Sequence, residues 1–221
     1  MNRAVAWSLA ICLCFCAEQA SAQGLLGKPN ISAQYLLSRA GDDFDPFDTK
    51  LGHGVRFQGS VPLIAADIDW LWGVGVDGFG GVTGLGFDAR IPSVPDVPLD
   101  VTLLGGDLGA TFYAHATDNI RPFAQLGINW NQVGVGISSG PSLTVTDTSL
   151  IFVGGVEVDV SPFAAVRASY GRGADGFGNG FNSAFVGEVI FRPGDHWFGR
   201  FSAIVADDKS VIGGFGAGFA W

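Results

Sequence analysis

Cysteine, long apolar runs and basic side chains are all scarce in this sequence. The three cysteines, Cys12, Cys14 and Cys16, lie near the N-terminus, so the rest of the chain holds no disulfide, thiol nucleophile or cysteine metal site. Beyond residue 23 no apolar run approaches the ~18 residues of a membrane-spanning helix. The 12 Lys and Arg residues against 21 Asp and Glu give a net charge of −9, which excludes the basic surface that nucleic-acid binding requires.

Residues 1–22 have the pattern of a secretory signal. Arg3 precedes the apolar segment Ala4–Ala17, and Ala20-Ser21-Ala22 forms a small-x-small cleavage site before Gln23. We therefore predict a cleaved signal peptide over residues 1–22 and one domain over residues 23–221. Because that domain crosses an oxidising compartment without cysteines, hydrogen bonding and packing must stabilise it.

Alternation of apolar with polar or small residues recurs along this domain, and the 34 glycines of the chain argue against helices. Only helices and closed β-barrels satisfy backbone hydrogen bonds within lipid. We predict an all-β protein, an antiparallel up-and-down transmembrane β-barrel of about ten strands, with eight or twelve as alternatives. The expected strands cover residues 30–40, 52–62, 67–77, 102–116, 122–135, 148–160, 163–172, 182–192, 197–206 and 211–221.

The expected connections alternate in length, as in bacterial barrels with short periplasmic turns and longer outer loops. Both ends of the chain fall on the short-turn side, which requires an even number of strands. The longest expected outer loop is Gly78–Val101, although Val82–Ile91 alternates enough to conceal an extra hairpin. A second long connection is expected over Gly136–Asp147.

Two segments carry a resemblance to a known family. The last strand, Val211–Trp221, places Phe215, Phe219 and Trp221 on one face and small residues on the other. Ile120–Asn131 opens with Arg-Pro-aromatic and continues with alternating small and apolar residues. Together they resemble the small OmpA/OmpX-type and Opa-type outer-membrane proteins of Gram-negative bacteria. The resemblance implies location in the outer membrane and makes Phe219 and Trp221 the signal that the outer-membrane assembly machinery reads.

Aromatic residues gather near the predicted short turns, three of which also contain a proline. At one height of a barrel such residues form an interfacial girdle. Strict alternation turns Phe123 and Phe163 inward, so their place in a girdle requires irregular strand starts. The predicted girdle consists of Phe123, Phe163, Phe191, Trp197 and Trp221.

Ionisable residues of the strands are expected to face inward, because a charge facing lipid costs ~2–4 kcal/mol at the midplane. We predict three ion pairs in the lumen, namely Glu157 with Arg167, Glu188 with Arg200, and Arg56 with Asp69. The other ionisable residues expected to face inward are Asp77, Asp107, His115 and Asp159. A barrel of roughly ten strands is nearly filled by its side chains, so these residues are interpreted as a polar core rather than a pore.

No sequence motif indicates a catalytic, cofactor or metal site. The glycine pattern Gly73–Gly78 is followed by more glycine, whereas a dinucleotide site requires a helix there. The acidic cluster Asp42–Asp48 lacks the spacing of a calcium loop.

The sequence favours a non-enzymatic outer-membrane protein, structural or surface-interacting through its extracellular loops, of which Gly78–Val101 is the largest. Its expected partners are outer-membrane lipid and the assembly machinery; the sequence does not identify an extracellular ligand. Three alternatives stay open. They are a narrow channel for small solutes or ions, a barrel hydrolase using His53, His115 or Asp69, and a soluble secreted β-sheet binding protein.

Overall fold

The computed structural model describes residues 24–39, 48–49, 51–66, 73–91, 94–137, 142–173, 183–207 and 209–221. The predicted signal peptide lies outside these residues. The strands are β1 (Asn30–Arg39), β2 (Asp48–Thr49), β3 (Gly52–Ile64), β4 (Val74–Ile91), β5 (Val94–Ala114), β6 (Ile120–Ile137), β7 (Ser142–Ser161), β8 (Ala164–Gly173), β9 (Ser183–Phe191), β10 (Trp197–Ala206) and β11 (Val211–Ala220). In this described part of the chain, no helix is long and apolar enough to cross a membrane.

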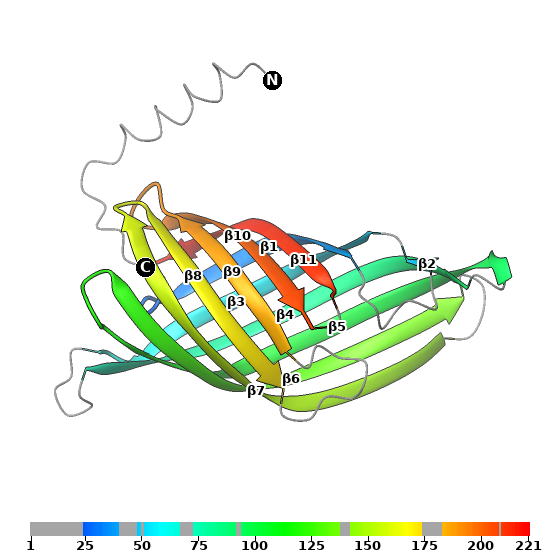
Figure 1. Ribbon diagram of the computed structural model, residues 1–221, viewed down its shortest axis with the longest axis horizontal. Coiled ribbons are helices and arrows are strands. Elements are labelled where there is room, and N and C mark those ends of the chain that lie inside the picture. The colour runs from blue at the N-terminus through cyan, green and yellow to red at the C-terminus, as the bar shows by residue number, and fades with distance from the viewer. Residues whose placement is uncertain are drawn as a thin grey trace, which may run out of the picture.

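All strands except the short β2 close into one barrel (Figure 1). The ring runs β4-β3-β1-β11-β10-β9-β8-β7-β6-β5, and β5 pairs with β4 to complete it. β1 pairs antiparallel with β11 from Asn30↔Ala220 to Arg39↔Val211, so both ends of the chain meet in one seam. The predicted fold class, a closed antiparallel up-and-down barrel of ten strands, is confirmed.

The largest difference from prediction lies in β4 and β5. β4 begins at Val74 rather than at residue 67, and residues 67–72 lie outside the described part of the chain. The predicted loop Gly78–Val101 is wrong, because β4 and β5 form a continuous ladder from Val74↔Ala114 to Arg90↔Pro98. The predicted connection over residues 136–147 is likewise too long, since β7 begins at Ser142.

In the part of the barrel nearest the C-terminus, the wall is apolar on its outer face and polar on its inner face. On β6, Leu126 and Ile128 are exposed on the outer face, whereas Arg121 is buried in the interior. β7 follows the same rule with Phe152 outside and Glu157 inside. Apolar outward and polar inward alternation is what a strand between lipid and a filled lumen requires.

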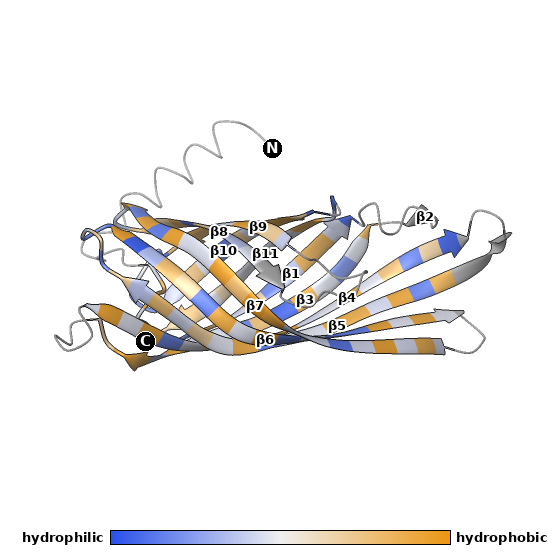
Figure 2. Ribbon diagram, turned by 60° about the horizontal axis from the view of Figure 1, so that its bottom comes forward, coloured by the Kyte–Doolittle hydropathy of each residue, from blue (hydrophilic) through white to orange (hydrophobic). Residues whose placement is uncertain are grey.

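The outer parts of β4 to β7 extend beyond the other strands at one end of the barrel (Figures 1 and 2). We call this extension, residues 85–91, 94–103, 132–137 and 142–149, the projecting sheet. It lies at the end opposite to the C-terminus (Figure 1). It therefore extends away from the end where the short turns and the seam residues Asn30 and Ala220 lie.

The polarity of the two faces reverses where the projecting sheet begins. Outward positions change from Leu104, Trp130 and Leu150 to the polar Thr102, Gln132 and Thr148. Inward positions become apolar at the directly paired Leu85, Leu103, Val133 and Val145. The reversal explains the wrong loop prediction: the outer half of β4 has polar outward residues, and so departs from the pattern of a membrane-spanning strand.

Candidate functional site

A chain of buried ions of alternating sign crosses the barrel interior from β6 to β10. It consists of Asp159, Arg121, Glu157, Arg167, Glu188 and Arg200. Each lies at an inward position, and consecutive members come from neighbouring strands. The three acids balance the three bases, so each buried charge has an opposite charge beside it, which offsets the cost of desolvation.

The shortest contacts of this ion chain lie around Glu157. The Arg167 Nη2 and Nε atoms donate to Glu157 Oε2 at 2.6 and 3.1 Å, and Arg121 Nε donates to Glu157 Oε1 at 3.1 Å. Arg121 Nη2 also contacts Asp159 Oδ1 at 2.5 Å. Glu157 is fully buried, and three of its contacts are charge-assisted hydrogen bonds, which are stronger than neutral ones.

Glu188 extends the ion chain toward the seam with longer contacts. Its Oε2 atom lies 3.6 Å from Arg167 Nη1 and 3.5 Å from Arg200 Nη2. Arg200 Nη1 in turn lies 3.4 Å from the Ser32 hydroxyl of β1. The β11 partner of Arg200 is Gly216, which has no side chain to separate Arg200 from β1.

The third predicted pair has a different partner. Arg56 of β3 contacts Asp107 of β5 at 3.1 Å, across β4, while Asp69 lies outside the described residues. Gly81 of β4 lies between them, and a Cβ at that position would stand 2.6 Å from Asp107 Oδ1. A glycine in the intervening strand thus permits an ion pair between next-nearest strands, a relationship that local alternation does not encode.

The segment Gly24–Pro29 folds into the barrel at the end where the short turns lie. Leu25 and Leu26 are buried, and the Gly27 N–H donates to Asp77 Oδ2 at 2.8 Å. The Lys28 ammonium is less favourably placed: burial, followed by repulsion from Arg192 and Arg121, lowers its pKa. None of the predicted strands includes this segment.

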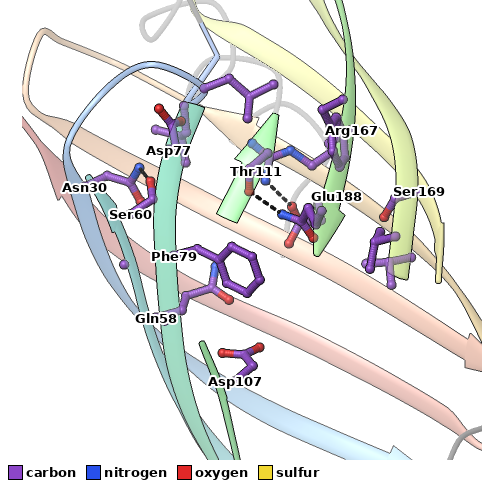
Figure 3. Close-up of a pocket in the computed structure, with 18 of the residues that line it drawn as sticks. Asn30, Gln58, Ser60, Asp77, Phe79, Asp107, Thr111, Arg167, Ser169 and Glu188 are labelled. Carbon is purple, nitrogen blue, oxygen red and sulfur yellow. Dashed lines mark hydrogen bonds and ion pairs between the residues drawn. The ribbon is translucent and has the colours of Figure 1, made fainter. Parts of the chain in front are cut away.

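A cavity of about 200 Å³ lies between this segment and the middle of the barrel. Asp77, Asp107, Arg167 and Glu188 approach the same space from different strands (Figure 3). One oxygen of Asp77 and the Nε atoms of Arg56 and Arg200 are buried without a hydrogen-bond partner. The cavity therefore offers polar groups of both signs to water or a small polar solute.

The interior is apolar toward the projecting sheet. The luminal apolar cluster consists of Leu36, Leu85, Phe87, Ala89, Leu99, Val101 and Ile212. Ile204 of β10 and Val135 of β6 pack against it from opposite parts of the wall. The two inward glycines of β3 make room, since a Cβ at Gly52 would lie 2.5 Å from Phe87. At this end the described residues thus fill the lumen with apolar side chains.

Four of the five predicted girdle residues are exposed or partly exposed at the end of the barrel where the C-terminus lies. Phe163 and Phe191 pack edge to face with ring centres 5.7 Å apart, and Trp197 and Trp221 are exposed to 64% and 60%. Phe123 was assigned wrongly: it is 7% exposed and packs inside the barrel with Leu26 and Tyr113. Its inward position follows from strict alternation along β6, which starts without irregularity.

Phe219 joins the two exposed tryptophans into one aromatic surface. Its ring centre lies 5.2 Å from Trp197 and 6.1 Å from Trp221. The assembly signal predicted for Phe219 and Trp221 therefore lies on a single surface at the seam, next to β10.

The histidines do not gather. His53 is on the outer face, where its Nδ1 lies 2.6 Å from the Tyr35 hydroxyl. His115, predicted to face inward, is exposed just past the end of β5. No group of three or more His, Cys, Asp or Glu residues in the described part of the chain is arranged to hold a metal ion.

Sequence reasoning missed Arg121 as a member of the interior site and did not find the partner of Asp77. Arg121 lies just before the predicted strand 122–135, although its parity with Gln125 on β6 would have placed it inward. Asp77 was predicted to face inward, but its partner is a backbone N–H from a segment without a periodic pattern.

Comparisons with known proteins agree with this architecture. The model of the family described as "Outer membrane protein beta-barrel domain" matches residues 8–198. No curated protein matches the sequence. Among solved structures, the translocator domain of the autotransporter NalP from Neisseria meningitidis is similar, with 14% identity, coverage of 99% of this chain and 97% of that one, and a TM-score of 0.54.

Two further solved structures are similar at low identity. The transport unit of the autotransporter AIDA-I from Escherichia coli has 9% identity, coverage of 100% and 98%, and a TM-score of 0.52. Ail from Yersinia pestis, in complex with the heparin analogue sucrose octasulfate, has 16% identity, coverage of 88% and 99%, and a TM-score of 0.43. At these identities NalP and AIDA-I support the barrel fold alone.

Proposed function

Because the chain belongs to the outer membrane protein β-barrel domain family, whose model matches residues 8–198, we propose that it is a non-enzymatic protein that recognises an extracellular polypeptide through its projecting sheet. Family membership and the apolar outer wall oppose the alternative of a soluble secreted binding protein. The proposal keeps the predicted surface role and moves it from loops to paired strands.

The main support for this function is the edge of β7 that has no strand partner among the described residues. β7 pairs with β6 as far as Gly136↔Ser142, but its pairing with β8 ends at Ile151↔Gly173. Among the described residues, nothing pairs with the β8-facing edge of residues 142–150. That edge contains no proline or lysine, the residues by which proteins commonly protect exposed edges. An extended segment of another polypeptide can add to such an edge through main-chain hydrogen bonds.

Apolar side chains accompany this free edge. The inward row Phe87, Val101, Val135 and Leu143 crosses the projecting sheet through directly paired residues. Its β4 and β5 members are buried, but Leu143 is 68% exposed, and Val145 beside it is 47% exposed. A strand added to β7 would continue the row and cover both side chains, which supplies specificity in addition to main-chain bonding.

The alternatives have less support. A channel requires a continuous lumen, whereas the described residues fill it with Leu25 and Leu26 at one end and the luminal apolar cluster at the other. A hydrolase requires a nucleophile, a base and an orienting group in contact. His53 and His115 lie on different parts of the surface, and Asp69 lies outside the described residues.

Selection from a random peptide library tests this function. The protein in nanodiscs serves as bait, with empty nanodiscs as background. We expect enrichment of extended peptides with alternating apolar residues, and loss of their binding in the variants Thr144→Lys/Thr146→Lys and Leu143→Ser/Val145→Ser. Thr148→Ser, a conservative change near the end of the same edge, is the control. Failure to enrich any peptide, or binding that survives both double substitutions, contradicts the proposal.

A further inference from the structure

The segment Gly24–Pro29 spans the end of the barrel and contacts walls on both sides. Leu25 packs into a cluster from β8 to β11, formed by Ala165, Ile190, Phe198 and Ala220. Leu26 packs instead with Tyr113 of β5 and Phe123 of β6. Two consecutive leucines thus reach different parts of the ring, and the segment lies across the opening between them.

Backbone hydrogen bonds fasten the same segment to inward carboxylates. The Gly27 N–H donates to Asp77 of β4 at 2.8 Å, and the Leu26 N–H lies 3.5 Å from Glu157 of β7. The Gly27 N–H is the hydrogen-bond partner of Asp77 Oδ2, whereas Asp77 Oδ1 is buried without a hydrogen-bond partner in the described part of the chain. Displacing the segment would remove this hydrogen bond from the Asp77 carboxylate.

The fit of the segment depends on two glycines. A Cβ at Gly24 would overlap the Glu157 carboxylate. Gly27 has φ +77°, a left-handed conformation that favours glycine, and a Cβ there would lie 2.5 Å from the Tyr113 hydroxyl. A turn bond from the Lys28 N–H to the Leu25 carbonyl, at 3.3 Å, holds the segment folded. The opening therefore has a shape complementary to this particular sequence.

We propose that Gly24–Pro29 is a plug that closes the periplasmic mouth of the barrel and separates the internal cavity from the periplasm. The mouth is accordingly a peptide-binding site that the chain's own N-terminal segment occupies. The plug joins the barrel wall covalently at β1, and its other contacts with the wall are non-covalent, so it can leave the mouth without unfolding the barrel.

The absence of cysteine after Cys16 permits a direct test of access to the cavity. Ser169 and Thr111 both line the cavity and are buried, so Ser169→Cys and, as a second reporter, Thr111→Cys place one thiol there. The labelling rate with a charged methanethiosulfonate reagent is measured on the protein in nanodiscs. Leu25→Asn/Leu26→Asn loosens the plug, and Leu25→Met/Leu26→Met preserves its apolar volume as the matched control.

We expect the Asn variant to be labelled at least about tenfold faster than the parent, because labelling no longer waits for local opening, and the Met variant to be labelled at the parental rate. A synthetic peptide, Gly-Leu-Leu-Gly-Lys, should slow the labelling of a chain that lacks residues 24–28. Heat-modifiable gel migration establishes that each variant is folded. Equal labelling rates in folded parent and folded Asn variant, whether both fast or both slow, would overturn the plug, as would a peptide that gives no protection.

Discussion

The Glu157 carboxylate of β7 is fully buried and accepts two hydrogen bonds from the Arg167 guanidinium of β8, at 2.6 and 3.1 Å. The two residues are direct partners in the β7–β8 ladder. Arg167 also lies 3.6 Å from Glu188, so it links two acids of the ion chain. Loss of one member therefore affects more than one pair.

Arg167→Met should destabilise the barrel by about 3–5 kcal/mol, because it leaves buried carboxylates with fewer cations. The double variant Glu157→Gln/Arg167→Met should lose less than the single one, since it removes one acid with the base. Urea unfolding in lipid vesicles, followed by tryptophan fluorescence, measures both. Arg56→Met is the comparison, because Arg56 and Asp107 are partly solvent-exposed and their pair should contribute less. A double variant less stable than Arg167→Met would contradict this interpretation.

Gly216→Ala should weaken the seam between β1 and β11. A Cβ at this position would overlap the Ala33 carbonyl, which is backbone and cannot rotate away. Gly154→Ala is the matched control, because a Cβ there meets no atom within 4 Å. We expect a lower melting temperature for Gly216→Ala, measured by heat-modifiable gel migration, and little change for Gly154→Ala. The same melting temperature in both variants would show that the seam is packed differently.

Deletion of Trp221, or Phe219→Ala, should reduce the amount of folded barrel in the outer membrane while export continues. These side chains form one aromatic surface with Trp197 at the seam, where an assembly factor can contact the last strand. Phe215→Ala, on the same outward face but farther from the C-terminus, serves as the control. The amounts of folded and unfolded protein in membrane fractions are measured from their gel bands and compared between the variants. Normal levels of folded Trp221-deleted protein would argue against an assembly role.

The number of strands and most face assignments could be predicted because they depend on local alternation, and the pairing of β1 with β11 follows once the strands close into an up-and-down barrel. Along β7, for example, Phe152 outside and Glu157 inside follow directly from their spacing. The projecting sheet was missed because the same rule assumes that the apolar residues of a strand face outward to lipid. Its alternation is present, but the apolar residues of the outer half of β4, such as Leu85 and Phe87, face inward, opposite to those of a strand in lipid.

Side-chain contacts between distant segments could not be predicted. The plug has no periodic pattern, and its Leu26 meets a carboxylate that lies 131 residues away along the chain. Arg56 pairs with Asp107 only because Gly81 of the intervening strand leaves room. Such contacts depend on the diameter and stagger of the closed barrel, which the sequence of a single strand does not contain.

We expect β7 to leave the membrane near Leu150 and to continue as part of the projecting sheet. Single spin-labelled cysteines at the even positions from Ser142 to Val158 locate this transition, since all of them face outward. In bilayers, labels at positions 150–158 should be accessible to oxygen, which concentrates in lipid, and labels at positions 142–148 to a water-soluble nickel complex. Oxygen accessibility that continues through positions 142–148 would contradict the account, because the projecting sheet would then lie within the membrane.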